Sequence, residues 1–122
     1  MQFGIFDQND HGPYPLGEQY EKRLQLIEFY DRSGFRTYHI SEHHSTPLSR
    51  TPSPSVFLAA VAQRTRRLRL GPLVYVLPMH HPLRLAEEIC MLDHLIPFPH
   101  QDDLTIYGND VIDWTSFGLR SI

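Results

Sequence analysis

Two histidine pairs are the residues of this sequence with the clearest capacity for chemistry. His43 and His44 follow Glu42 at the end of one apolar segment, and His80 and His81 follow the end of another. A neutral imidazole can accept a proton or donate a hydrogen bond near neutral pH, which suits acid–base catalysis and ligand binding. The pattern predicts that His43 or His44 contacts a substrate or a cofactor, with Glu42 beside it.

Metal binding is the first alternative for the residues around His43. His39, Glu42, His43 and His44 include residue types that bind zinc. Alternate side chains of a strand point to opposite faces, which separates His39 and His43 from Glu42, and His44 then shares the face of Glu42. No Cys or Asp completes a known ligand spacing, so we expect no metal. A second alternative stays open, in which the histidines are rim or loop residues that bond to backbone and water.

The elements that must hold these residues follow from hydrophobic periodicity and turn residues. In the segment 17–33, Tyr20, Leu24 and Ile27 recur on one helical face, and Gly34 is placed as the left-handed residue that ends the helix. The same reasoning applied along the chain predicts strands at 3–6, 35–42 and 68–77, and helices at 17–33, 54–65 and 82–95.

Three of these segments are apolar enough to be buried. The first strand, 3–6, is short and rich in aromatic residues, so we expect it to be buried. The third strand, 68–77, is almost continuously apolar, which is typical of a strand covered on both faces in a parallel sheet. The helix 54–65 is apolar nearly all round, so both of its sides should be covered.

Strict alternation of strands and helices indicates parallel strands joined by right-handed crossovers. Two α/β architectures fit this order, an open doubly wound sheet and a (β/α) barrel, and periodicity does not choose between them. The length of 122 residues limits the second architecture. An eight-stranded barrel takes about 250 residues, so this chain holds only part of one.

Charge and cysteine content exclude several classes of function. The chain has 11 basic and 14 acidic residues, a net charge of −3, so nothing favours nucleic-acid binding. Cys90, the only cysteine, is expected to be a small core hydrophobe in a reducing, cytoplasmic setting. No apolar run approaches the ~20 residues of a membrane helix, so no membrane association is expected.

A local cluster of arginines follows the second predicted helix. Its members are Arg64, Arg66, Arg67 and Arg69. Basic residues at a helix C-terminus offset the negative end of the helix dipole, and this is the expected role of the cluster. Phosphate binding is the alternative.

Five stretches of the sequence together carry a family resemblance. In chain order they are Phe-Gly-Ile-Phe from residue 3, Ser-Glu-His-His from residue 41, Pro-Ser-Pro-Ser-Val-Phe-Leu-Ala-Ala from residue 52, Leu-Arg-Leu-Gly-Pro-Leu-Val-Tyr-Val-Leu-Pro from residue 68, and His-Pro-Leu-Arg-Leu-Ala-Glu-Glu-Ile-Cys-Met-Leu-Asp from residue 81. Over residues 1–95 the chain resembles the N-terminal part of the bacterial luciferase-like flavin-dependent monooxygenases. The second and last stretches are weak alone and specific together.

The resemblance implies a fold and a class of reaction. The fold would be a partial, TIM-like (β/α) barrel of about three βα units. The reaction would be that of an oxidoreductase in which a reduced flavin and O2 oxidise a small organic substrate. The cofactor would be FMN, or the deazaflavin F420 as the alternative. Homo-oligomers are also expected from the resemblance, because family members often pair through their early helices.

The resemblance also assigns roles to particular residues. His43 matches the family's active-site histidine; it would contact the flavin and act in catalysis, as a base or as a group that stabilises the flavin intermediate. Glu42 would orient His43 or a neighbouring loop. Leu73 and Val74 match the position of a non-proline cis peptide that lies under the flavin ring, and would form the cofactor platform.

The resemblance stops at Ile96. Residues 96–122 hold four aspartates against Arg120 alone and show no clear period, so we expect an irregular, acidic tail unrelated to the domain 1–95. Within this tail, 104–107 is predicted to be a short strand. We expect a truncated or frameshifted product that is inactive alone, and the absence of any bound cofactor is an alternative to FMN or F420. The alternative is a non-catalytic fragment or a partner subunit of a barrel enzyme.

Overall fold

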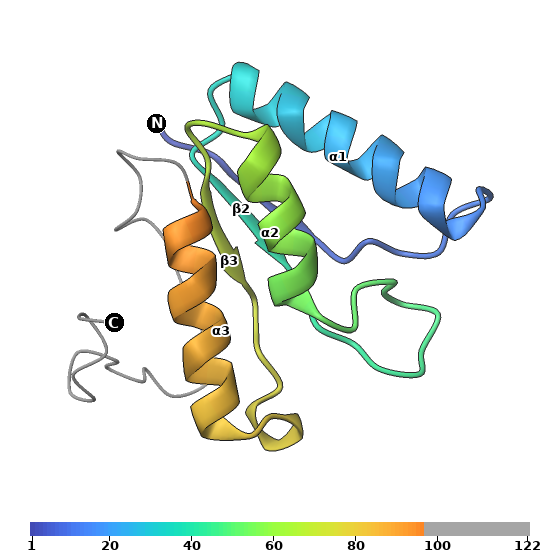
Figure 1. Ribbon diagram of the computed structural model, residues 1–122. Helices are drawn as coiled ribbons and strands as arrows, with labels where there is room; N and C mark the ends of the chain where they lie inside the picture. Colours follow the sequence, from blue (N-terminus) through green and yellow to red (C-terminus); the bar gives the residue numbers. More distant parts are fainter. Residues whose placement is uncertain (97–122) are drawn as a thin grey trace.

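The computed structural model describes residues 1–96 and consists of three strands that alternate with three long helices (Figure 1). The predicted strand at 104–107 and the rest of the expected tail lie outside the described residues. In chain order the elements are β1 (Gly4–Asp7), α1 (Leu16–Arg32), β2 (Thr37–Ile40), α2 (Pro54–Arg64), β3 (Arg69–Pro72), the 3₁₀ helix η1 (Leu77–Met79) and α3 (Pro82–Leu95).

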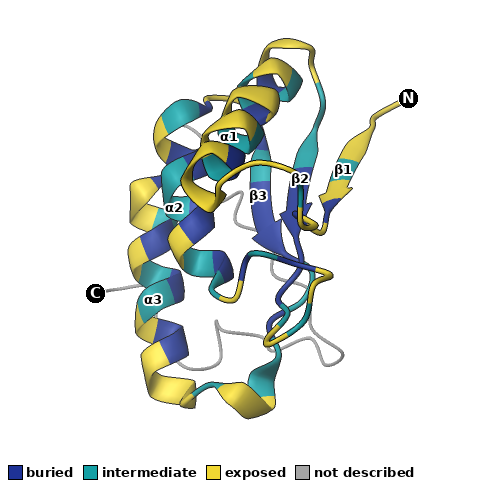
Figure 2. Cartoon of the chain, turned by 90° about the vertical axis from the view of Figure 1, so that its right-hand side faces the viewer, coloured by how far each residue is buried: buried dark blue, intermediate teal, exposed yellow. Residues whose placement is uncertain are grey.

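The three strands form one parallel sheet in the order β1-β2-β3. Phe6, His39 and Gly71 lie side by side across it. The helices α1, α2 and α3 all cover the same face of this sheet (Figure 2). A doubly wound sheet reverses its strand order at a switch point. Residues 1–96 show no such reversal, so their sequential order is consistent with the expected partial (β/α) barrel.

The main hydrophobic core lies between the sheet and the helices. Its completely buried members come from the central strand and from the helix above it, as Tyr38, Ile40, Leu58 and Val61 show. Ile96, just past the end of α3, is 3% exposed and belongs to the same core. The packed unit therefore includes one residue more than the resemblance suggested.

Helix α1 ends as the sequence predicts. Gly34 follows it with a φ of +83°, a conformation that costs glycine little and strains other residues. The end of α2 differs from expectation, because Arg64 donates hydrogen bonds to Glu21 and Glu28 on α1. This arginine therefore joins two helices, a role that neither the dipole nor the phosphate interpretation included.

Burial of the sheet is one-sided in the described part of the chain. Phe3 is 60% exposed and Phe6 of β1 is 51% exposed, so the prediction that segment 3–6 is buried was wrong. The helices cover only one face, and β1 is paired on only one edge. Coverage of α2 is also incomplete, because Val56 is 72% exposed. No helix within residues 1–96 is long and apolar enough to cross a membrane.

The strand β3 is shorter than the sequence predicts. The strand ends at Pro72, and Leu73 adds one more backbone hydrogen bond to β2, at the Ile40 carbonyl. Residues 74–76 then leave the ladder before η1 begins at Leu77. The backbone N–H of Val76 donates to a carboxylate on the neighbouring segment instead of to a strand. A run of apolar residues does not reveal this change, because hydrophobicity describes side chains and the change is in the acceptor of a backbone N–H.

Candidate functional site

The carboxyl ends of the three parallel strands meet at one rim of the sheet. Ser41, just past β2, donates its backbone N–H to the carbonyl oxygen of Asp7 on β1, 3.0 Å away. Leu73, just past β3, donates to the carbonyl of Ile40 at 2.8 Å. Ligands of parallel α/β folds bind at this end of the strands. The segments after β2 and β3 are therefore the candidate site.

A buried carboxylate, that of Glu42, organises this rim. The Glu42 side chain has no exposed surface. It accepts hydrogen bonds from His44 Nε2 at 2.7 Å, from His80 Nε2 at 2.9 and 3.0 Å, and from the Val76 backbone N–H at 2.9 Å. Glu42 thus ties the end of β2 to the segment that connects β3 with α3, 38 residues further along the chain.

Hydrogen bonding keeps the Glu42 carboxyl ionised. Burial alone raises its pKa, but the bonds from His44, His80 and the Val76 N–H outweigh burial and hold the pKa below its ordinary value. An ionised carboxylate only accepts hydrogen bonds. Both imidazoles must therefore donate from Nε2.

His80 is held from a second side by an aromatic ring. The rings of Tyr75 and His80 pack edge to face, with centroids 5.5 Å apart. Tyr75 is itself almost fully buried, and its hydroxyl pairs with Ser55 Oγ at 2.6 Å. Burial raises the pKa of Tyr75 to about 12, so its hydroxyl stays protonated near neutral pH. His80 therefore lies between the ionised Glu42 carboxylate and the neutral ring of Tyr75.

The site residues predicted from the sequence are only partly brought together. Glu42 lies at the centre of the rim, whereas His43 is half-buried and makes no side-chain hydrogen bond within residues 1–96. His44, which the sequence placed on the same face as Glu42, bonds to it. Leu73 and Val74 are half-buried, and the peptide bond between them is cis, as the resemblance predicts.

The role of His80 could not be assigned from the sequence. Its position past a strand end marked it as one of several rim histidines, without indicating a partner. Ser41 was also missed. Its side chain is buried, and its hydroxyl oxygen has no hydrogen-bond partner within the described residues.

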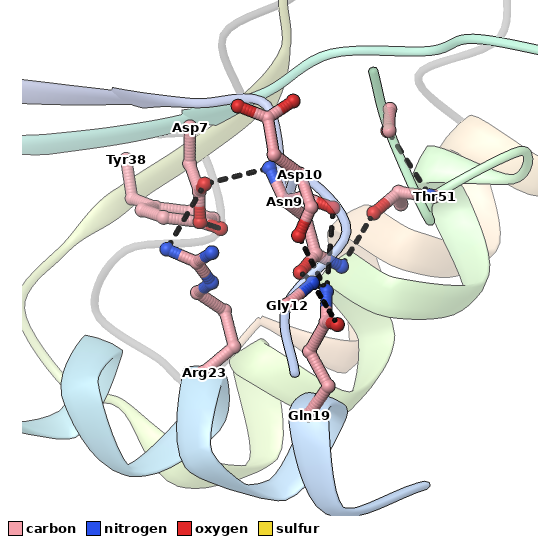
Figure 3. A network of polar contacts seen from close by, with 9 residues as sticks. Asp7, Asn9, Asp10, Gly12, Gln19, Arg23, Tyr38 and Thr51 are labelled. Carbon is pink, nitrogen blue, oxygen red and sulfur yellow. Dashed lines mark hydrogen bonds and ion pairs between the residues drawn. The ribbon is translucent and has the colours of Figure 1, made fainter. Parts of the chain in front are cut away.

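A second carboxylate, Asp7 at the end of β1, has a different environment (Figure 3). It accepts hydrogen bonds from the Tyr38 hydroxyl at 2.7 Å and from the Asn9 backbone N–H at 2.8 Å. Arg23 on α1 adds an ion pair at 3.3 Å. Burial, followed by the nearby charge of Asp7, raises the pKa of Tyr38. This carboxylate is surrounded by groups that keep their protons near neutral pH.

The loop after β1 is fixed by the same network (Figure 3). Asn9 is completely buried, with a φ of +51°, and its side-chain amide donates to Thr51 Oγ1 at 3.0 Å. Gln19 on α1 donates to Asn9 Oδ1 at 3.1 Å and to the Asp10 carbonyl at 2.8 Å. Gly12 donates its N–H back to Gln19. These bonds join the loops after β1 and β2.

The alternative of a metal site concerns the same rim. Within residues 1–96, no group of three or more His, Cys, Asp or Glu residues is arranged to hold a metal ion. The Nε2 atoms of His44 and His80 donate to Glu42, so these two nitrogens are engaged within the rim.

Comparison with known proteins identifies a family. The family described as luciferase-like monooxygenase matches residues 1–97. A protein of Sinorhizobium fredii with the name y4wF is 58% identical over 95 residues, which cover 78% of this chain and 28% of its own. Limonene 1,2-monooxygenase of Rhodococcus erythropolis is 41% identical over 99 residues, covering 74% and 26%. A flavin-dependent trigonelline monooxygenase, the oxygenase component from Acinetobacter baylyi, is 34% identical over 74 residues, covering 61% and 21%.

Solved structures share the fold. The oxygenating constituent of 3,6-diketocamphane monooxygenase from Pseudomonas putida, in complex with FMN, superposes with a TM-score of 0.78 at 21% identity. It covers 99% of this chain and 33% of its own. The F420-dependent tetrahydromethanopterin reductase of Methanopyrus kandleri superposes with a TM-score of 0.61 at 23% identity, covering 96% and 30%. The chain therefore spans about a third or less of the length of these proteins.

Proposed function

Because the chain belongs to the luciferase-like monooxygenase family, we propose that it provides part of a site where a reduced flavin and O2 oxidise an organic substrate. The family match over residues 1–97 is the observation that carries this proposal. The chain covers only 26% of limonene 1,2-monooxygenase. That the chain takes part in the complete oxidation reaction is therefore also a proposal. The expected cytoplasmic location remains a prediction.

We take FMN as the cofactor, with F420 as the alternative. A relative that is 34% identical has a flavin-dependent activity by name, and FMN is bound in one protein of the same fold. A more distant protein of that fold depends on F420. When bound, the reduced cofactor would supply the electrons that activate O2.

The residues at the rim fit a flat ring with polar edges. Leu73 and Val74 are half-buried and offer an apolar platform, which suits a ring system. The buried hydroxyl of Ser41 has no hydrogen-bond partner within residues 1–96, and buried polar groups usually have one. We assign Leu73 and Val74 to the platform and Ser41 to a polar contact.

The polar residues of the rim would bind and orient. His43 is half-buried and bears no hydrogen bond within residues 1–96, so its imidazole is available to the cofactor or substrate. Glu42 acts through its neighbours, because its buried carboxylate is fully engaged by His44, His80 and Val76. We therefore assign Glu42 as a positioning residue and leave ligand contact to the histidines.

A titration with reduced cofactor tests the proposal. The purified 122-residue chain is titrated under anaerobic conditions with reduced FMN and, separately, with reduced F420, while cofactor fluorescence and thermal unfolding are followed. A ligand that binds only the folded chain raises the unfolding temperature by mass action. We expect saturable binding and a rise in unfolding temperature with FMN. No fluorescence change and no thermal shift at high cofactor concentration would contradict the proposal.

A further inference from the structure

The Glu42 carboxylate fixes the protons of its neighbours. It is buried and ionised, and its acceptor sites are taken by two imidazoles and one backbone N–H. Each imidazole therefore holds its proton on Nε2. In a neutral imidazole the second nitrogen, Nδ1, is then the acceptor. Glu42 thus presents two oriented bases at the rim.

His80 is the more firmly held of the two. Its Nε2 lies within 3.0 Å of both Glu42 oxygens, whereas His44 reaches only one of them. The Tyr75 ring packs against His80, and the His80 backbone N–H donates to the Leu77 carbonyl at 3.0 Å. Its side chain is 22% exposed, against 36% for His44. His80 is therefore oriented and still accessible to a ligand.

We propose that His80 is a further functional residue of this rim, which Glu42 orients as a base with Nδ1 as its proton acceptor. This assignment rests on the proposed function, because the group that gives its proton to His80 belongs to the bound ligand. An O–H or N–H group of the ligand gives its proton to Nδ1, the N–H bond forms, and the bonding electron pair stays on the ligand atom. The imidazolium that results is stabilised by the adjacent Glu42 carboxylate.

Nitrogen NMR of the histidine side chains tests this assignment. The full chain is labelled with ¹⁵N-histidine, and long-range ¹H–¹⁵N spectra are recorded at mildly alkaline pH, where imidazoles are neutral. His80→Gln and His44→Gln assign the signals. We expect His80 to show an Nε2 proton that is protected from exchange with water. Glu42→Gln should abolish that protection, whereas His81→Gln, a change at the exposed neighbour, should leave it intact.

Addition of reduced FMN separates the two proposals. A shift of the His80 Nδ1 signal that saturates together with flavin binding supports the assignment. FMN binding that moves the His43 signals and leaves His80 Nδ1 unchanged overturns the role of His80 and leaves the proposed function standing. Absence of FMN binding overturns both proposals. A His80 ring with its proton on Nδ1, or an Nε2 proton unaffected by Glu42→Gln, overturns the Glu42 contribution. If Glu42→Gln does not fold, Glu42→Asp is used in its place. Aspartate keeps the charge on a side chain that is one methylene shorter, so the His80 Nε2 proton should be less protected than in the wild type.

Discussion

The two buried carboxylates at the strand ends differ in the partners that surround them. Asp7 is bound by a tyrosine hydroxyl, a backbone N–H and an arginine, all of which keep their protons near neutral pH. Glu42 is bound by two imidazoles and by one backbone N–H. Imidazole is the side-chain group best suited to proton exchange near neutral pH. Similar burial therefore serves two purposes. The Asp7 network holds loops together, and the Glu42 network holds groups that can exchange protons.

The largest expected effect separates the two networks by stability. Asp7→Ala leaves the buried Tyr38 hydroxyl and the Asn9 N–H without their acceptor, and removes the partner of Arg23. We expect a loss of about 3 kcal/mol in the free energy of unfolding, measured with urea. Asp10→Ala is the matched control, because the Asp10 residue is exposed and only its backbone carbonyl is bonded. Equal effects of the two changes would contradict a structural role for the Asp7 side chain.

The next effect concerns Glu42. Glu42→Gln removes the charge that three donors share, and hydrogen bonds to charged groups contribute about 1.5–3 kcal/mol each. Because the glutamine oxygen can still accept from Val76, we expect a net loss of about 2 kcal/mol in the free energy of unfolding. The same urea experiment measures it. A loss below that of Asp10→Ala would show that the Glu42 network is not formed.

Acid should remove the advantage of Glu42 over glutamine. The folded-state pKa of Glu42 is held below the ordinary value of 4.5 by its hydrogen bonds, after the opposing effect of burial. Its contribution to stability is therefore complete above that value and is lost as pH falls through the folded-state pKa. Unfolding free energies of the wild type and Glu42→Gln should converge below pH 4.5. A gap that stays constant over this range would contradict the assignment.

A smaller effect tests how Tyr75 positions the His80 imidazole. Tyr75→Phe keeps the ring that packs on His80 and removes the hydroxyl bonded to Ser55. We expect a loss of about 1 kcal/mol in the free energy of unfolding, and a protected Nε2 proton on His80 as in the wild type. Ser55→Ala removes the same bond from its other end and should give a similar loss. Loss of the His80 signal in Tyr75→Phe would show that the hydroxyl, and not the ring, positions the imidazole.

The smallest expected effect on stability is at Ser41. Its buried hydroxyl has no partner within residues 1–96, so Ser41→Ala should change the free energy of unfolding by less than about 1 kcal/mol, and can increase it. Reduced FMN should bind several-fold more weakly to this variant, because the proposed polar contact is lost. Fluorescence titration measures the affinity. Unchanged affinity would remove Ser41 from the proposed site.

Local sequence patterns predicted much of the fold. The apolar face of Tyr20, Leu24 and Ile27 located α1, and strict alternation of elements gave the parallel sheet. The exposure of Phe6 was not predictable, because it depends on which face of the sheet the helices cover. The extent of β3 was also misjudged, since side-chain hydrophobicity does not show where a backbone leaves its ladder.

The site was harder to predict than the fold. Glu42 and His80 stand 38 residues apart, so their contact depends on strand register and on the path of the segment after β3. Face alternation did indicate that His44, and not His43, lies on the side of Glu42. Asn9 and Thr51 lie in loops, and Gln19 lies in the first turn of α1. No side-chain period indicated that these residues bond to one another. The cis peptide between Leu73 and Val74 was expected only from the family resemblance.

The most direct test of the difference between the Asp7 and Glu42 networks is a backbone NMR titration of the full chain with reduced FMN. We expect saturable shifts at residues 41–44 and 73–80, around Glu42. We expect little change at Asn9 and Gln19, which belong to the structural network of Asp7. Shifts centred on Asn9 and Gln19, or no shifts under conditions that saturate binding, would contradict the claim that the Glu42 rim is the functional site.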